Sequence, residues 1–104
     1  MDNSRVNRNG EVWVYIEAVH GKIADVSLEL LSKGRELADK LAVPLAGMLI
    51  GSGVASLAAK VFSCGADRVY AADHPLLERY ETLAYAKAAV ALIEEHNPQI
   101  VIYG

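Results

Sequence analysis

The sequence predicts an α/β domain of the Rossmann-like type, in which an open, mainly parallel sheet lies between two layers of helices. Short β-branched and apolar runs alternate with segments of helical periodicity, which is the pattern of βαβ units. The chain has 104 residues, and 53% of them are hydrophobic. This is enough to bury one core without disulfides or a structural metal, and it leaves no room for a second domain.

The first strand is expected at residues 12–16, where β-branched and aromatic residues run from Gly10 towards a His20-Gly21 turn. Apolar residues at helical spacing then predict a helix that ends near residue 41, with Ser27 as its N-cap. Its solvent face carries three opposite-charge pairs at i,i+4 spacing. They are Glu29 with Lys33, Arg35 with Asp39, and Glu36 with Lys40.

The second strand is expected at residues 44–50, followed by a Gly51-Ser52-Gly53 turn and a short Ala-rich helix at 54–64 that Gly65 closes. A third strand at 68–72 stops at Asp73-His74-Pro75. A long helix then begins at Glu81 or Thr82 and ends near His96, because Asn97 precedes Pro98. The fourth strand is expected at 100–103.

Right-handed crossovers place these strands in the spatial order third, second, first, fourth. The fourth strand then lies at an open edge of the sheet. An open edge has unpaired backbone groups, so self-association of the chain through this strand is expected.

Composition excludes several function classes. The formal net charge of −3 provides no broad positive field for nucleic acid, and no apolar run approaches the roughly 20 residues of a membrane span. A cytoplasmic protein without membrane insertion is expected. The single Cys64 is interpreted as a structural thiol rather than a reactive one. The histidines His20, His74 and His96 are too scattered to predict a metal site.

The strongest local signal for a ligand is the Gly51-Ser52-Gly53 turn, which follows a strand and opens a helix as a phosphate-binding turn does. Asp73 stands near the end of the next strand, where a dinucleotide site has its acidic residue. Ser56, however, occupies the place of the third glycine. Gly51, Ser52, Gly53 and Asp73 are therefore candidate nucleotide-binding residues, and a purely structural turn is the favoured interpretation.

No catalytic residue is predicted. Asp73 and His74 are adjacent and rarely point together, and Ser52 and Ser56 lack the G-x-S-x-G pattern of a serine hydrolase. Glu17, at the end of the first strand, either meets a ligand or faces solvent, and solvent is favoured. Tyr80 and Tyr85 are expected to pack rather than to stack on a base.

Two groups of residues resemble the electron-transfer flavoprotein α subunit, over about residue 11 to the end. The first group is Val12-Trp13-Val14-Tyr15-Ile16-Glu17, Gly21-Lys22-Ile23, Ser27-Leu28-Glu29-Leu30-Leu31 and Arg35-Glu36-Leu37-Ala38. The second and more specific group is Gly65-Ala66-Asp67-Arg68-Val69-Tyr70, Asp73, Pro75-Leu76-Leu77, Tyr80, Tyr85-Ala86 and Pro98-Gln99-Ile100-Val101.

The resemblance implies an adenine-nucleotide-hydrolase-like fold and an α/β heterodimer that carries electrons from flavin-linked dehydrogenases to a redox acceptor. In that family FAD is held mainly by a C-terminal domain of the α subunit. Residues 1–10 are then a flexible tail, and residues 11–104 are the N-terminal domain, truncated after the fourth strand. No FAD-contacting or catalytic residue is carried over, and no cofactor is expected in this piece. The alternative is a stand-alone adenine-nucleotide-binding module.

Overall fold

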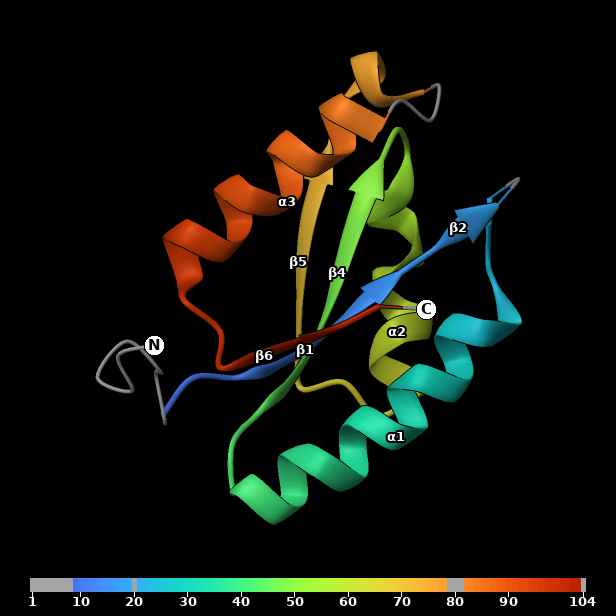
Figure 1. Cartoon of the computed structure of the whole chain (residues 1–104). Helices are drawn as coiled ribbons and strands as arrows, with labels where there is room; N and C mark the ends of the chain where they lie inside the picture. Colours follow the sequence, from blue (N-terminus) through green and yellow to red (C-terminus); the bar gives the residue numbers. More distant parts are fainter. Residues whose placement is uncertain (1–8, 20, 79–81, 104) are drawn as a thin grey trace.

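The computed structural model describes residues 9–19, 21–78 and 82–103, and a sheet of four parallel strands forms its centre (Figure 1). The strands are β1 (Val12–Ile16), β4 (Leu45–Gly51), β5 (Arg68–Asp73) and β6 (Ile100–Ile102). They lie in the order β5-β4-β1-β6, and every neighbouring pair is parallel. The predicted strand order is therefore confirmed, and each predicted strand boundary lies within one residue of the observed one.

Helices cover both faces of the sheet, as a Rossmann-like domain requires. The helices α1 (Asp25–Leu41) and α2 (Ala58–Ser63) lie on one face, and α3 (Thr82–His96) lies on the other (Figure 1). Successive side chains of a strand point to opposite faces of the sheet, so the core consists of two clusters, one on each face. Val14 and Ile16 of β1 pack with the α1 side, whereas Trp13 packs with Met48 and residues of α3.

The central pair of strands carries most of the core. All seven residues of β4 are buried, and four of the five residues of β1 are buried as well. A strand that is covered on both faces is apolar throughout instead of alternating. This explains why the sequence of β4, Leu-Ala-Gly-Met-Leu-Ile-Gly, contains no charged residue.

The start of α1 differs from the prediction. The helix begins at Asp25 with Ala24 as its N-cap residue, so Ser27 lies inside the first turn. Ser27 is only 1% exposed, and its Oγ accepts a hydrogen bond from the backbone N–H of Glu17 at 2.8 Å. The predicted capping role was wrong, because the hydroxyl joins the helix to the end of β1 instead.

The two other predicted helices are present, and the shorter one differs slightly at its first residues. The short Ala-rich segment begins as a 3-10 turn, η2 (Val54–Leu57), before it becomes α2. Gly65 has a φ of +108°, in agreement with the predicted left-handed end of that helix. The prediction offered Glu81 or Thr82 as the start of the long helix. The helix α3 begins at Thr82, and Glu81 lies outside the described residues.

A small hairpin of β2 (Ala18–Val19) and β3 (Lys22–Ile23) was not predicted. Its two-residue strands are too short to show a period of alternation. Gly21 of the predicted turn has a φ of +76°, and His20 lies outside the described residues. Residues 1–8 of the predicted tail also lie outside them, while Gly10 is buried and its carbonyl accepts a hydrogen bond from Gln99.

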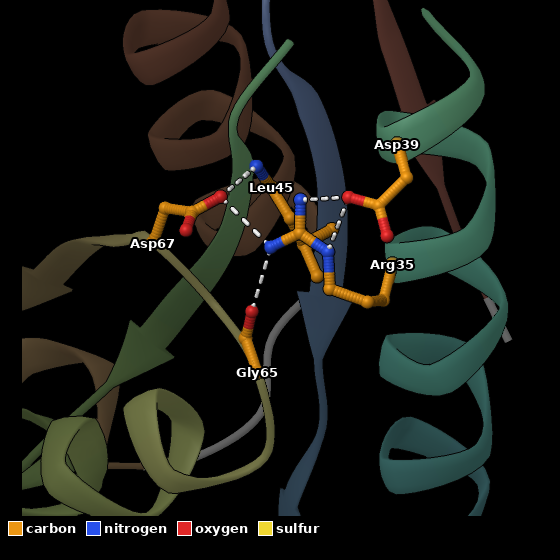
Figure 2. A network of polar contacts seen from close by, with 5 residues as sticks. All are labelled: Arg35, Asp39, Leu45, Gly65 and Asp67. Atoms are coloured by element: carbon orange, nitrogen blue, oxygen red, sulfur yellow. Dashed lines mark hydrogen bonds and ion pairs between the residues drawn. The ribbon is translucent and has the colours of Figure 1, made fainter. Parts of the chain in front are cut away.

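An ionic network joins α1 to the amino end of the sheet (Figure 2). Asp67 Oδ2 accepts from the backbone N–H of Leu45 at 2.9 Å and from Arg35 Nη1 at 2.8 Å. Arg35 also donates to the carbonyl of Gly65 and pairs with Asp39. These bonds lower the pKa of Asp67, chiefly through the Leu45 amide and then through Arg35.

Of the three charge pairs predicted on α1, only Arg35 with Asp39 forms an ion pair within the part of the chain that the structure describes. This outcome agrees with the small energy of exposed pairs. The same network shows the structural role of the Gly65-Ala66-Asp67 segment. It supplies a carbonyl and a carboxylate that connect α1, β4 and the loop before β5.

We predict that Asp67→Ala destabilises the fold by about 1–2 kcal/mol, because it leaves the buried Leu45 amide without its acceptor. Asp39→Ala, which removes only the exposed side of the network, should cost a few tenths of a kcal/mol. Urea unfolding of the two variants and the wild type measures both values. Equal losses in the two variants would contradict the assigned role of Asp67.

We also predict that Gly34→Ala destabilises the domain although it lies within α1. A Cβ at this position would stand 2.8 Å from Val14 Cγ2 and 2.9 Å from Leu45 Cδ1. Alanine gains about 1 kcal/mol of helix propensity, whereas overpacking a core costs about 1–3 kcal/mol, so a net loss of roughly 1 kcal/mol is expected. Ser32→Ala on the exposed face of α1 is the control. Increased stability of Gly34→Ala in urea would refute the close packing.

Candidate functional site

The structure brings the four candidate nucleotide-binding residues together at the carboxyl end of the sheet. Gly51 ends β4 and lies opposite Asp73 in the β4–β5 register, and Ser52 and Gly53 form the turn that follows. Gly53 has a φ of +73°, which favours glycine at this position. Gly51 is buried, whereas the other three residues are exposed.

The carboxylate of Asp73 binds the turn directly. Its Oδ1 accepts a hydrogen bond from the N–H of Gly53 at 2.7 Å, and its Oδ2 accepts one from the N–H of Ala55 at 2.8 Å. These two bonds, that of Ala55 first, hold the pKa of Asp73 below its ordinary value. The carboxylate is thus an internal anion on the backbone amides at the start of η2.

The same amides are those that a phosphate would use in a glycine-rich turn. A phosphate placed there would find both N–H groups already bonded and would meet the negative charge of Asp73. In this conformation the turn does not fit the pyrophosphate of a dinucleotide. Ser56 Oγ donates to the carbonyl of Gly53 at 2.9 Å, which further closes the turn on itself.

A cavity of about 450 Å³ lies beside this turn. Its walls come from β4, the turn, η2, the 3-10 turn η3 (Pro75–Leu77), Tyr85 of α3 and the β2–β3 hairpin. Open α/β sheets bind ligands at this end of their strands. Among the described residues that line the cavity, Glu78 is the only charged one, so these residues supply no cation to neutralise a phosphate.

The remaining sequence candidates are held apart from any common centre. His74 Nδ1 accepts a hydrogen bond from the N–H of Leu76 at 3.1 Å and caps η3, so Asp73 and His74 each bind a different stretch of backbone. Glu17 is exposed at the end of β1. Tyr85 packs on the sheet and donates to the carbonyl of Leu77, while Tyr80 lies outside the described residues.

The described residues contain no group of three or more His, Cys, Asp or Glu side chains that could hold a metal ion. Within the same residues, no helix is long and apolar enough to cross a membrane. Cys64 is a free, half-buried thiol that packs against the α1 side of the core.

A polar cluster at the opposite, amino end of the sheet was missed by sequence reasoning. Glu11 is buried, and its Oε1 accepts from Trp13 Nε1 at 3.0 Å and from the hydroxyl of Tyr70 at 2.8 Å. Its other carboxylate oxygen pairs with Arg68. Burial and the bond to Glu11 raise the pKa of Tyr70.

Trp13 and Tyr70 of this cluster stack on each other, and the ring of His96 packs against both at a tilt. Trp13 and Tyr70 have ring centroids 4.8 Å apart, and His96 lies 4.2 Å from Tyr70. The only sequence signal was a carboxylate directly before a buried strand. It could not be interpreted without the sheet order, which places Arg68 and Tyr70 of β5 on the same side of the sheet end as Glu11.

We predict that Asp73→Asn makes the domain less stable at neutral pH and removes part of its acid sensitivity. In the folded domain the pKa of Asp73 lies below its ordinary value of about 3.8. The contribution of Asp73 to the free energy of unfolding is therefore complete at pH values above 3.8. The contribution disappears as the pH falls through the lowered pKa. Unfolding in urea between neutral pH and about pH 2 measures this difference. Glu36→Gln, on the exposed face of α1, is the control for the loss of one charge. If the stability of Asp73→Asn and of the wild type fell by the same amount between neutral pH and about pH 2, the assigned role of Asp73 would be contradicted.

Known proteins resemble this chain along most of its length. Residues 12–104 match the electron transfer flavoprotein domain. The electron transfer flavoprotein subunit alpha of Thermoanaerobacterium thermosaccharolyticum is 40% identical over 99 residues, which cover 95% of this chain and 30% of that relative. The corresponding subunit of Clostridium acetobutylicum is 43% identical over 93 residues, or 89% of this chain and 28% of the relative.

Protein FixB of Rhizobium meliloti is 44% identical over 97 residues, which cover 89% of this chain and 28% of the relative. The chain thus spans about three tenths of the length of the curated relatives that it matches. The match includes all four strands of the sheet and both helical layers. The chain therefore belongs to the electron transfer flavoprotein domain family.

Proposed function

We propose that this chain is the N-terminal scaffold and subunit-contact domain of an electron-transfer flavoprotein α subunit. The whole protein would carry electrons from flavin-linked dehydrogenases to a redox acceptor in the cytoplasm. Family membership and the names of the relatives support this role. The observation that carries it is the bonding of the Asp73 carboxylate to Gly53 and Ala55, because it favours a structural use of the turn.

In this proposal residues 11–104 are the α/β domain, and residues 1–10 are a tail. FAD is held by sequence outside this chain, in a C-terminal domain of the α subunit, and a β subunit completes the heterodimer. Among the described residues that line the 450 Å³ cavity the one charged residue is acidic, Glu78, and this agrees with that division of labour. The domain would act as a carrier component without an active site of its own.

A stand-alone adenine-nucleotide-binding module is the second candidate. The cavity favours it, since it lies at the carboxyl ends of the strands next to Gly51, Ser52 and Gly53. For this function Asp73 would have to release the turn and turn towards a ribose hydroxyl. That movement exposes two backbone amides whose only described acceptor is Asp73, which makes this candidate the weaker one.

We predict that flavin binds only when the domain is part of a longer α subunit. One sample is the 104-residue chain. The other is the Clostridium acetobutylicum α subunit in which residues 12–104 of this chain replace the matching segment, co-expressed with its β subunit. The visible absorption spectrum of each purified sample reports bound flavin, and flavin bands are expected in the chimaeric complex alone.

The unmodified Clostridium acetobutylicum complex is the control for expression and flavin loading. Flavin or adenine nucleotide retained by the 104-residue chain would overturn the scaffold role and support the nucleotide-binding module. A folded chimaeric complex without flavin would show that this domain cannot serve as the scaffold of an α subunit.

A further inference from the structure

The outer face of α3 is unusually apolar for a surface that no described element covers. The inner face packs on the sheet through residues that include Tyr85, Ala89 and Leu92. On the outer face Leu83 is 61% exposed and Val90 is 51% exposed. A helix that is apolar on two sides is usually covered on both. This points to a partner that lies along α3.

Two charged residues flank the middle of this outer face. Lys87, Val90, Ala91 and Glu94 follow one another at helical spacings of three, one and three residues, so they form one stripe. Together with Ala86 they line a shallow groove of about 360 Å³. In the described part of the chain, neither Lys87 nor Glu94 forms an ion pair.

The stripe is complementary to itself. Lys87 lies three residues before Val90, and Glu94 lies three residues after Ala91. If a second α3 is laid antiparallel with a two-fold axis between positions 90 and 91, each Lys87 faces a Glu94 of the other copy. Val90 then faces Ala91 across the axis. We propose that the outer face of α3 binds a second copy of this chain in this antiparallel, two-fold arrangement.

The side chains at the centre suit close approach of two helices. Ala86 and Ala91 are small, so the axes can reach the 8–10 Å separation of packed helices. The Val90 side chain of one copy enters the groove of the other. Both copies use the same residues, as a two-fold interface requires. One helix pair buries less than the roughly 1,600 Å² of a standard interface, so the dimer is weak and reversible.

This surface is separate from the open edge at β6, which is the other place where two copies can meet. β6 lies at the end of the sheet order, and among the described strands it pairs with β1 alone. Edge pairing uses backbone groups and does not depend on the charges of α3. The outer-face dimer depends on them and weakens as salt screens the pairs. Charge reversal therefore distinguishes the two surfaces.

Sedimentation equilibrium of the 104-residue chain, from about 10 μM to 1 mM at low salt, tests the proposal. The wild type is expected to dimerise reversibly. Lys87→Glu and Glu94→Lys each place like charges across the axis and are expected to raise the dimer dissociation constant about tenfold or more. The double variant Lys87→Glu/Glu94→Lys restores both pairs and should dimerise as the wild type does.

A mixture of the two single variants gives an independent result, since one carries two acidic positions on the stripe and the other carries two basic ones. The mixed dimer should form more tightly than either variant alone. Lys22→Glu and Glu29→Lys are matched controls with the same charge changes on exposed residues of other elements. A monomeric wild type at all concentrations would overturn the proposal. A dimer insensitive to Lys87→Glu, or a double variant without recovery, would overturn it as well.

Discussion

The parallel pairing of β1 with β4 is the constraint on which the rest of this domain depends. Both strands are buried, because α1 and α2 cover one face of the pair and α3 covers the other. Strands in this position are apolar throughout. Their own side chains therefore cannot form hydrogen bonds with the backbone N–H and C=O groups at the ends of the strands. Polar residues of neighbouring segments supply some of those hydrogen-bond partners, and the carboxylates of Asp67 and Asp73 do so.

Two carboxylates illustrate this use, and a third carboxylate binds side chains beside the end of a strand. Asp67 accepts from the first amide of β4, and its own backbone N–H donates to the Leu45 carbonyl at 2.7 Å. At the carboxyl end, Asp73 accepts from the turn that leaves β4. Glu11 collects bonds from Trp13, Arg68 and Tyr70 beside the start of β1. These carboxylates are therefore bonded within the domain at the ends of the sheet, which agrees with the proposed scaffold role.

Sequence patterns predicted the sheet order and the strand boundaries well, because apolar runs, glycine turns and the handedness of crossovers are each strong and local constraints. They failed at Ser27, which has the chemistry of an N-cap but is buried inside the first turn of α1, and at the hairpin of two-residue strands. The candidate turn and Asp73 were placed together correctly. The direction of the Asp73 carboxylate was not predictable, since it depends on register across 18 to 20 residues. The Glu11 cluster was missed because its members lie 57 and 59 residues apart.

The most direct test of this account observes the Gly53 and Ala55 amides by NMR while pH is varied and then while AMP is added. The account predicts that both amide signals follow the titration of Asp73, with an apparent pKa below its ordinary value. It also predicts that AMP leaves them unchanged at neutral pH. Saturable shifts of these two amides by AMP, together with loss of their dependence on Asp73, would contradict it.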